Sequence, residues 1–331
     1  MTVRGPDTRF QASMDGPPVL EAVDLRKRYG DRTVVDGVAV SVNAGEIVGL
    51  LGPNGAGKTT ILSILGGTLE SDSGTVRIAG YDLRLTPARA RRSLGLVPQS
   101  VAVYPTLTAV ENLDFFGRIQ GLKKADAHGA TAALLKEVGL TDRANDIVGT
   151  FSGGMKRRLN LACGMLHRPE VLLLDEASAG VDPQSRELIF AVIKSAAAHG
   201  TAILYSTHYM EEAELLCNRV ILIDHGHIVA EGSVRQLVAL AGMEGRVDLT
   251  TRVSMPVGWT RTLAGVRELA IVSNGAPCAA LAVQSLDERV PEIISLASEL
   301  GGGIVELHLH RPNLQDAFIA LTGHALRDNA I

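Results

Sequence analysis

Residues 52–59 form a glycine-rich run that follows an apolar stretch and precedes a segment with a helical pattern. Few folds can accommodate this arrangement. The run matches G-x-x-x-x-G-K-[ST] at every fixed position. Residues 47–51 before it are typical of a buried strand, and residues 59–66 after it indicate a helix. Glycines let such a loop curl until successive backbone N–H groups point at phosphate oxygens. The run consists of Gly52, Pro53, Asn54, Gly55, Ala56, Gly57, Lys58 and Thr59.

The polar groups of this phosphate loop have expected tasks. The Lys58 ammonium is placed to reach the β- and γ-phosphates of a nucleotide, and the Thr59 hydroxyl is placed to coordinate Mg²⁺. The N-terminus of the following helix adds positive charge, and Thr60 in its first turn is a further expected nucleotide contact. The alternative is a glycine-rich turn that binds nothing, against which the flanking strand and helix argue.

Two adjacent carboxylates follow a second apolar run. Residues 171–174 indicate a buried strand, and Asp175 and Glu176 come directly after it. Asp175 is a candidate Mg²⁺ ligand, usually through a water, and Glu176 is placed to polarise an attacking water. Adjacent carboxylates near phosphate are electrostatically unfavourable unless a cation is present. The alternative is a buried strand that ends in solvated acidic residues.

Composition excludes several classes of protein. The chain has 331 residues with 46% apolar and 21% charged residues, which is ordinary for a globular protein that builds its own core. A net charge of −4 gives no basic footprint, so nucleic acid is not an expected partner. Cys163, Cys217 and Cys278 are widely spaced, which fits a reducing cytosol better than a disulfide framework or a zinc site. No apolar run reaches membrane-spanning length.

Apolar strands alternate with helices along most of the chain, which predicts an α/β fold with a largely parallel sheet. Residues 1–18 are interpreted as a flexible tail, residues 19–242 as the main domain and residues 243–331 as a small α+β domain. The expected strands cover residues 19–25, 34–42, 47–51, 171–174, 202–205, 220–223, 227–230, 246–253, 269–273 and 304–308. The expected helices cover residues 59–66, 108–140, 185–199, 210–216, 290–300 and 314–321.

A serine and two glycines ahead of Asp175 narrow the range of families to which the sequence can belong. Residues 151–159 resemble the signature motif of ABC (ATP-binding cassette) ATPases. Three residues of this range, Ser152, Gly153 and Gly154, are here called the signature segment. Residues 151–159 also indicate a helix that Ser152 caps. Further motifs of that family are present in order, namely an adenine-stacking aromatic at Tyr29, a Q-loop at Gln99, a D-loop ending at Asp182 and a switch histidine at His208.

The resemblance covers residues 19–240 and implies a P-loop NTPase fold, with a mixed sheet core and a helical subdomain that carries the signature segment. It implies that ATP is trapped between two subunits, each lending its signature segment to the nucleotide of the other. The subunits form a homodimer or a pseudo-symmetric dimer. The implied cofactors are ATP and Mg²⁺. The implied catalytic residues are Lys58, Gln99, Glu176 and His208, and the implied metal ligands are Thr59, Gln99 and Asp175.

Several residues have other interpretations when taken alone. Phe151 and Met155 depart from the Leu and Gln of many family members, and Met155 removes a polar side chain near the shared site. Residues 156–158, Lys-Arg-Arg, are interpreted as a solvated helix face. The alternatives for the motif residues are a plain aromatic at Tyr29, a solvated loop residue at Gln99, a helix cap only at Ser152 and a core histidine at His208.

Residues 312–323 resemble the tail of ATPases that serve ABC-2-type exporters, a group that includes daunorubicin-type resistance ATPases. This implies a peripheral subunit at the cytoplasmic face of the cell membrane, bound to a separate permease and serving export, with drug or antibiotic efflux as one possible task. Residues 99–111 are the expected permease contact, with Tyr104 and Glu111 as candidates and a capping box at Thr108 and Glu111. The alternatives are an ABC ATPase acting on DNA or ribosomes and a non-catalytic nucleotide-binding regulator.

Overall fold

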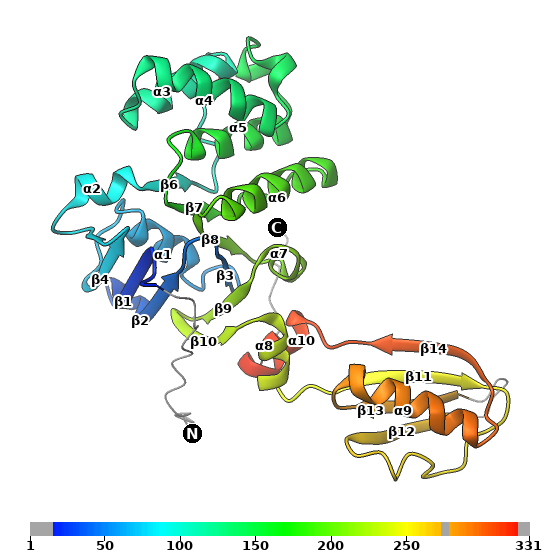
Figure 1. Ribbon diagram of the computed structural model, residues 1–331. Helices are drawn as coiled ribbons and strands as arrows, with labels where there is room; N and C mark the ends of the chain where they lie inside the picture. The colour runs from blue at the N-terminus through cyan, green and yellow to red at the C-terminus, as the bar shows by residue number, and fades with distance from the viewer. Residues whose placement is uncertain (1–15, 273–277, 324–331) are drawn as a thin grey trace. The chain divides into compact units, whose positions relative to one another are not determined.

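The computed structural model describes residues 16–272 and 278–323 (Figure 1). The flexible tail expected over residues 1–18 lies mostly outside the described residues. Contacts divide the chain into two compact units, with the division between Ser233 and Val234. The sequence places the boundary near residues 241–245, whereas α8 (Val234–Leu240) belongs to the second unit, where it packs against α10 (Leu314–Thr322).

The first unit is organised around a six-stranded sheet with the strand order β10-β9-β3-β8-β7-β6. β10 pairs antiparallel with β9, and all other neighbours in this sheet are parallel. The expectation of a largely parallel sheet is therefore confirmed. The strands are β3 (Ile47–Leu51), β6 (Leu94–Val97), β7 (Val171–Asp175), β8 (Ala202–Thr207), β9 (Arg219–Asp224) and β10 (His227–Gly232).

The central strands of this sheet are apolar because both of their faces are covered. Every residue of β3, β7 and β8 is buried, which explains their continuous apolar runs in place of an alternating pattern. Parallel strands end at one edge of a sheet. The segments that follow β3, β7 and β8 therefore come together there, although more than one hundred residues separate β3 from β7 in the sequence.

An antiparallel sheet with the order β2-β1-β4-β5 completes the main fold of the first unit. Its apolar residues form one buried cluster with α1 and with one face of the parallel sheet, so α1 lies between the two sheets. The sequence predicted β1 and β2 but not the short strands β4 and β5. The elements are β1 (Leu20–Tyr29), β2 (Arg32–Val42), α1 (Lys58–Leu65), β4 (Ser73–Ile78) and β5 (Tyr81–Asp82).

A helical group formed by α3 (Ala109–Ile119), α4 (Lys124–Glu137) and α5 (Gly153–Met165) is inserted between β6 and β7 (Figure 1). α3 begins with the predicted capping box, in which Thr108 and Glu111 bond each other's backbone N–H groups. The group packs against α6 (Pro183–Ala198) through a second apolar cluster. The remaining helices of this unit are α2 (Pro87–Arg92) and α7 (Met210–Leu216).

The second unit contains an antiparallel sheet with the order β12-β13-β11-β14. α9 (Leu286–Glu299) packs on this sheet around a small core that includes Leu249, Leu281 and Ile293. The sequence predicted every element of this unit except β13 and α8. Its strands are β11 (Gly245–Thr251), β12 (Val266–Val272), β13 (Cys278–Val283) and β14 (Ile304–His310).

Candidate functional site

The phosphate loop connects β3 to α1, as the sequence predicts, and two of its glycines are required by close contacts. A Cβ at Gly52 would lie 2.2 Å from the carbonyl oxygen of Ile223. Gly57 precedes the first residue of α1 with φ 105°, and a Cβ there would lie 2.7 Å from the Val34 carbonyl oxygen. A Cβ at Gly55 would meet no protein atom within 4 Å, so the loop is open at this position. The loop backbone is thus fixed by β2 and β9 around an open cradle.

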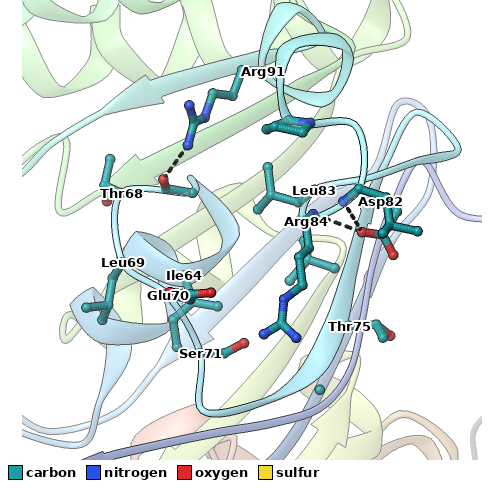
Figure 2. A pocket seen from close by; sticks show the side chains of 15 residues that line it. Ile64, Thr68, Leu69, Glu70, Ser71, Thr75, Asp82, Leu83, Arg84 and Arg91 are labelled. Carbon is teal, nitrogen blue, oxygen red and sulfur yellow. Dashed lines mark hydrogen bonds between the residues drawn. The ribbon is translucent and has the colours of Figure 1, made fainter.

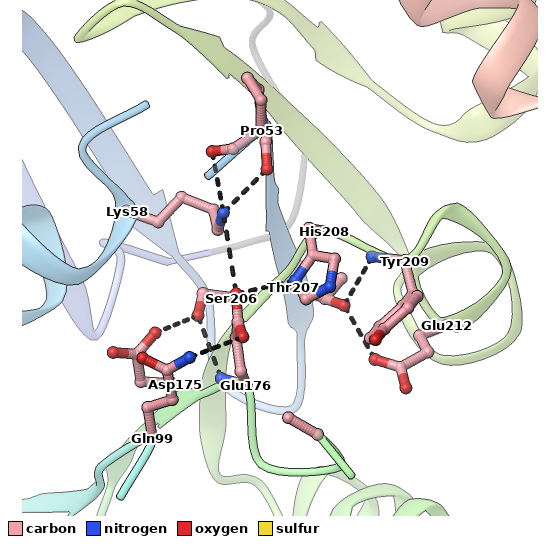
Figure 3. A network of polar contacts seen from close by, with 12 residues as sticks. Pro53, Lys58, Gln99, Asp175, Glu176, Ser206, Thr207, His208, Tyr209 and Glu212 are labelled. Atoms are coloured by element: carbon pink, nitrogen blue, oxygen red, sulfur yellow. Dashed lines mark hydrogen bonds and ion pairs between the residues drawn. The ribbon is translucent and has the colours of Figure 1, made fainter. Parts of the chain in front are cut away.

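Lys58 begins α1 and points back into this cradle (Figure 3). Its ammonium donates hydrogen bonds to the carbonyl oxygens of Gly52, at 2.8 Å, and Pro53, at 3.1 Å. The side chain is 5% exposed, and burial lowers the pKa of the ammonium, while the carboxylates of Glu176 and Asp175 oppose that shift. A buried cation held by backbone oxygens is suited to an anionic ligand, because phosphate oxygens would replace weaker acceptors.

Asp175 and Glu176 stand at the carboxyl end of β7, and both are buried. Asp175 accepts a hydrogen bond of 2.5 Å from the Ser206 hydroxyl on the neighbouring strand. The backbone N–H of Glu176 donates to the Ser206 carbonyl oxygen at 3.1 Å. Glu176 has φ 46°, a left-handed conformation that costs energy for a non-glycine residue and that clusters at functional sites. The chain thus turns sharply at the residue predicted to activate water.

Glu176 is the residue on which the predicted site converges (Figure 3). The Gln99 amide donates to one of its carboxylate oxygens at 2.9 Å, and Nδ1 of His208 lies 2.9 Å from the other. The Lys58 ammonium lies 3.8 Å from that second oxygen. Gln99 follows β6 and His208 follows β8. One edge of the parallel sheet therefore gathers four residues predicted from separate motifs.

The residues around this edge suit Mg²⁺. The metal-ligand set predicted from the sequence offers a hydroxyl at Thr59, an amide at Gln99 and a carboxylate at Asp175, and Mg²⁺ takes oxygen ligands while keeping several waters. Thr59 is exposed at the start of α1, one residue after the buried Lys58. The Gln99 amide nitrogen donates to Glu176, so the amide oxygen is the atom of this side chain that can bind a metal ion. The donor chemistry fits, with few protein ligands and room for phosphate and water.

Tyr29 ends β1 at a hairpin and is 51% exposed. It pairs with Arg32, the first residue of β2, and the Lys27 ammonium lies 5.9 Å from its ring centre. Val34, two residues further along β2, is the residue whose carbonyl oxygen approaches Gly57. The same strand that flanks the phosphate loop therefore begins beside an accessible aromatic ring.

The signature segment stands at the start of α5, on a different element from the phosphate loop. The Ser152 hydroxyl caps α5 by accepting a hydrogen bond of 3.2 Å from the Met155 N–H, as the sequence predicts. Ser152 and Gly153 are exposed, whereas Gly154 is buried against the start of α6. The two exposed positions leave N–H groups and the positive end of a helix facing outward.

Asp182 caps the neighbouring helix α6, since its carboxylate accepts a hydrogen bond of 2.9 Å from the Ser185 N–H. This bond is the leading cause that holds the pKa of Asp182 below its usual range. A Cβ added at Gly154 would lie 2.3 Å from the Ser185 hydroxyl oxygen and 2.9 Å from Asp182. The signature segment and the D-loop aspartate are therefore in direct contact.

The interpretation of residues 156–158 as a solvated helix face is wrong for Arg157. This side chain is 8% exposed, and its guanidinium donates to the backbone carbonyl oxygens of Gln99 and, at 3.3 Å, Ala179. Burial lowers the pKa of the guanidinium, against the pull of Glu176. Arg158 is half-buried and donates to the Val138 carbonyl oxygen at 2.5 Å. Arg157 therefore joins α5 to the segment that follows β6, which carries Gln99, and to the segment that follows β7, which carries Glu176.

The two departures from the signature pattern have structural reasons. Phe151 is buried in the apolar cluster of the helical group, and Met155 packs partly buried against the same cluster. An apolar residue at position 155 is therefore accommodated by α5 itself. The Ser152 cap uses the Met155 backbone N–H and does not depend on its side chain.

Glu212 is a buried carboxylate that the sequence analysis did not single out. It lies on α7, is 2% exposed, and accepts hydrogen bonds from the hydroxyls of Ser178, Tyr205 and Thr207. The Thr207 hydroxyl also accepts a bond of 3.0 Å from the Tyr209 N–H. Residues 211–214, Glu-Glu-Ala-Glu, offer three carboxylates, and the helical period alone could have shown which of them faces β8.

Lys58, Gln99, Glu176 and His208 are here called the Glu176 cluster. Several hollows lie apart from this cluster, and two of them are described here. One, of about 600 Å³, lies between the end of α1, β4 and the segment of Asp82 to Arg91, where Arg91 donates to the Gly67 carbonyl oxygen at 2.9 Å (Figure 2). It contains none of the predicted site residues. The other, here called the α2 cleft, has about 520 Å³ and is lined by α2, β6, α3 and α5.

Ala102, from the predicted permease contact over residues 99–111, lines the α2 cleft, whereas the candidates Tyr104 and Glu111 are not in its lining. Tyr104 is 44% exposed and packs edge-on against Phe115, with ring centres 4.7 Å apart. The Glu111 carboxylate accepts a bond of 2.8 Å from the Thr108 N–H in the α3 cap. Among the described residues, no helix is long and apolar enough to cross a membrane.

Comparisons with known proteins agree with this geometry. Residues 35–179 match the family model described as "ABC transporter". The chain is 39% identical over 322 residues to the linearmycin resistance ATP-binding protein LnrL of Bacillus subtilis, covering 94% of this chain and 100% of that protein. It is 39% identical to the Nod factor export ATP-binding protein I of Ralstonia nicotianae, covering 94% of this chain and 96% of that protein.

The fold is also found among solved structures. A structure described as the ATP-binding subunit of an ABC transporter superposes with a TM-score of 0.63 at 31% sequence identity, covering 68% of this chain and 93% of that chain. The relatives match along nearly their whole length, and their shared description agrees with the phosphate loop and the acidic strand end. This chain belongs to the ABC transporter family, as an ATP-binding subunit with an ABC ATPase domain.

Proposed function

We propose that this chain hydrolyses Mg²⁺-bound ATP at the Glu176 cluster and uses the energy to drive export through a separate permease. Lys58 would exchange its backbone acceptors for the β- and γ-phosphates, which the open cradle at Gly55 leaves room to enter. Glu176 would accept a proton from the attacking water while His208 holds the carboxylate in place. Tyr29 would stack on the adenine.

The observation that carries this proposal is the position of Glu176. Its buried carboxylate contacts one residue from each of three separate motifs, at Lys58, Gln99 and His208. Thr59, Gln99 and Asp175 would hold Mg²⁺, which when bound neutralises charge that develops on phosphate oxygens. Gln99 would change its partner from Glu176 to the metal, since it contacts the carboxylate here.

The reaction would be completed by a second subunit. Ser152 and Gly153 are exposed at the positive end of α5, which suits an anion brought from outside the chain. The γ-phosphate of a nucleotide bound by another copy is such an anion. Contact between Gly154 and Asp182 would let this anion influence the D-loop of the same chain. A homodimer or a pseudo-symmetric dimer places two nucleotides in its seam.

The permease would dock in the α2 cleft. Asn160 lines this cleft and is 3% exposed; its amide oxygen accepts a bond of 3.0 Å from the Ala102 N–H, while its amide nitrogen has no hydrogen-bond partner among the described residues. Phe116 and Ile119 form an apolar wall of the cleft. An apolar helix that ends in a free carbonyl oxygen would match both features, and would hold the subunit at the cytoplasmic face of the membrane.

Export of a drug or antibiotic is the proposed task. One relative is described by resistance to linearmycin and another by Nod factor export, and both match over 94% of this chain. In this proposal the permease binds the cargo, and the residues of the ATPase do not determine its identity.

Substitution of Glu176 tests the proposed reaction. Glu176→Gln keeps the size and hydrogen-bonding reach of the side chain but removes its basicity. The variant is expected to bind ATP with Mg²⁺ as the wild type does, to form a stable nucleotide-bound dimer, and to lose about 10²–10³-fold in turnover. Phosphate release and size-exclusion chromatography measure these properties. Equal turnover in the two proteins would remove Glu176 from the proposed role.

A further inference from the structure

Two sets of polar contacts, here called ties, connect the segment after β7 to the end of β8 and the segment after it. The first is the contact of Glu176 with His208, at 2.9 Å. The second runs through the buried carboxylate of Glu212 (Figure 3), which accepts the Ser178 hydroxyl at 2.6 Å and the Thr207 hydroxyl at 2.8 Å. Ser178 lies two residues after Glu176, and Thr207 directly precedes His208. The second tie therefore holds residues that lie within two positions of the two residues that form the first.

We propose that Glu212 is a positioning residue for ATP hydrolysis, which fixes His208 against Glu176 by joining Thr207 to Ser178 through hydrogen bonds. The inference rests on the proposed roles of Glu176 and His208. Glu212 touches neither of them in the described contacts, so its effect would pass through Ser178 and Thr207.

The burial of Glu212 makes this tie specific. A buried carboxylate is costly unless its oxygens accept hydrogen bonds. Ser178 bonds one oxygen, and Tyr205, at 2.7 Å, and Thr207 bond the other. The Arg186 guanidinium lies 3.6 Å from the oxygen that Ser178 bonds, which offsets part of the charge from α6. Loss of the Ser178 or the Thr207 hydroxyl therefore removes one hydrogen bond of the carboxylate and loosens one segment relative to it.

The Thr207 hydroxyl fixes the backbone on both sides of His208. It donates to Glu212 and accepts from the Tyr209 N–H at 3.0 Å, so it spans the histidine. The backbone of His208 can then move little relative to Glu176 without breaking one of these bonds. On the other side, Ser178 belongs to the segment that ends at Asp182, where the signature segment packs against α6. The hydrogen bonds of Glu212 thus connect the surface that is proposed to face the second subunit to His208, which contacts Glu176.

Two substitutions of Thr207 separate positioning from packing. Thr207→Val keeps the shape of a side chain that is 1% exposed but removes the hydroxyl, whereas Thr207→Ser removes a buried methyl group and keeps the hydroxyl. A positioning role predicts that Thr207→Val loses about tenfold or more in kcat, with the KM for ATP changed less than about twofold. Thr207→Ser is expected to retain most of the turnover. A packing role predicts the opposite order.

A second pair checks the other end of the tie. Ser178→Ala is expected to lower kcat as Thr207→Val does, and Ser178→Thr, which keeps a hydroxyl, to rescue it in part. Thr207→Val and Ser178→Ala combined should cost less than the sum of their separate effects, because both act on one carboxylate. Thermal unfolding confirms that each variant is folded, and fluorescent ATP binding confirms that its nucleotide affinity is unchanged.

The outcomes distinguish this inference from the proposed function. Wild-type protein without Mg²⁺-dependent turnover, or with turnover unchanged in Glu176→Gln, would overturn the proposed reaction itself. An active wild type with an inactive Glu176→Gln variant, but with full kcat in Thr207→Val and Ser178→Ala, would overturn only the positioning role of Glu212. A fall in ATP affinity without a fall in kcat would also overturn it.

Discussion

Gly154 leaves no room for a single methyl group between α5 and α6. A Cβ there would lie 2.3 Å from the Ser185 hydroxyl oxygen, whereas a Cβ at the preceding Gly153 would meet no atom within 4 Å. We expect Gly154→Ala to destabilise the protein by about 1–3 kcal/mol through overpacking. Gly153→Ala is the matched control and should change stability by less than about 1 kcal/mol. Urea unfolding measures both, and equal losses would contradict the close contact.

The cysteines differ in their access to alkylating reagents. Burial raises the pKa of Cys217 to about 12 and also raises that of Cys163, so both remain protonated at pH 8. Since the thiolate is the reacting form, they are expected to resist iodoacetamide in the folded protein. Cys278 is half-buried, as Cys217 is, whereas Cys163 is buried, so Cys278 should react before Cys163. Peptide mass spectrometry after a timed reaction checks the order, and rapid labelling of Cys217 at pH 8 would contradict the expected resistance.

Local patterns could predict the residues of the site that belong to motifs, and could not predict those that act through distant contacts. Asp175 ends β7, and Glu176 directly follows it. His208 directly follows β8, and Lys58, in the phosphate loop, begins α1. Arg157 belongs to a run of three basic residues, a pattern typical of a solvated face. Its burial depends on carbonyl oxygens contributed by the segments that follow β6 and β7, which no local period reveals.

At the scale of elements, α5 is fastened to the sheet edge by Arg157. The guanidinium reaches carbonyl oxygens of Gln99 and Ala179, so one side chain joins the helix to two loops. Arg157→Met is expected to lower the free energy of unfolding by about 2 kcal/mol, because it removes the partly buried hydrogen bonds of a buried side chain to backbone carbonyl oxygens.

Lys156→Met provides the control for that substitution. Lys156 makes one long bond of 3.4 Å to the Gly149 carbonyl oxygen, and it should contribute less than about 0.5 kcal/mol as a surface residue. Thermal and urea unfolding of the two variants compare them directly. If Lys156→Met lowered the free energy of unfolding as much as Arg157→Met does, the contacts of Arg157 with the two loops would not explain its effect.

Elements marked by a continuous apolar run or a clear helical period were predicted better than elements without such a pattern. β3 and α7 have the bounds that the sequence indicates, because a continuous apolar run or a clear helical period marks each of them. β4, β5, α2 and β6 were missed, and they have at most six residues each. Short segments without such a pattern cannot be assigned from the sequence alone, and β4 and β6 form because pairing with β1 and β7 stabilises them.

At the scale of the whole molecule, the two units should respond differently to nucleotide. The phosphate loop and the Glu176 cluster belong to the first unit, and the second unit contains none of the predicted site residues. ATP with Mg²⁺ at one hundred times its Kd is expected to stabilise the first unit by about 2.7 kcal/mol, and to leave the unfolding of the second unchanged.

Calorimetry of the Glu176→Gln variant tests this expectation without consumption of ATP. Two transitions should be seen, of which only one moves to higher temperature with nucleotide. Residue-resolved hydrogen exchange assigns them, since β7 and β13 report on the first and the second unit. A single transition that moves as a whole would show that the units unfold together.

The place of β8 in the sheet, between β3 and β7, has a consequence for synthesis of the chain. β3 and its phosphate loop leave the ribosome early, but the strand that separates β3 from β7 ends only at Thr207. A nascent chain must therefore keep the early strand available, or pair it provisionally, until most of the first unit has emerged. Capture of nucleotide by stalled chains of increasing length would then rise abruptly once residue 208 clears the exit tunnel.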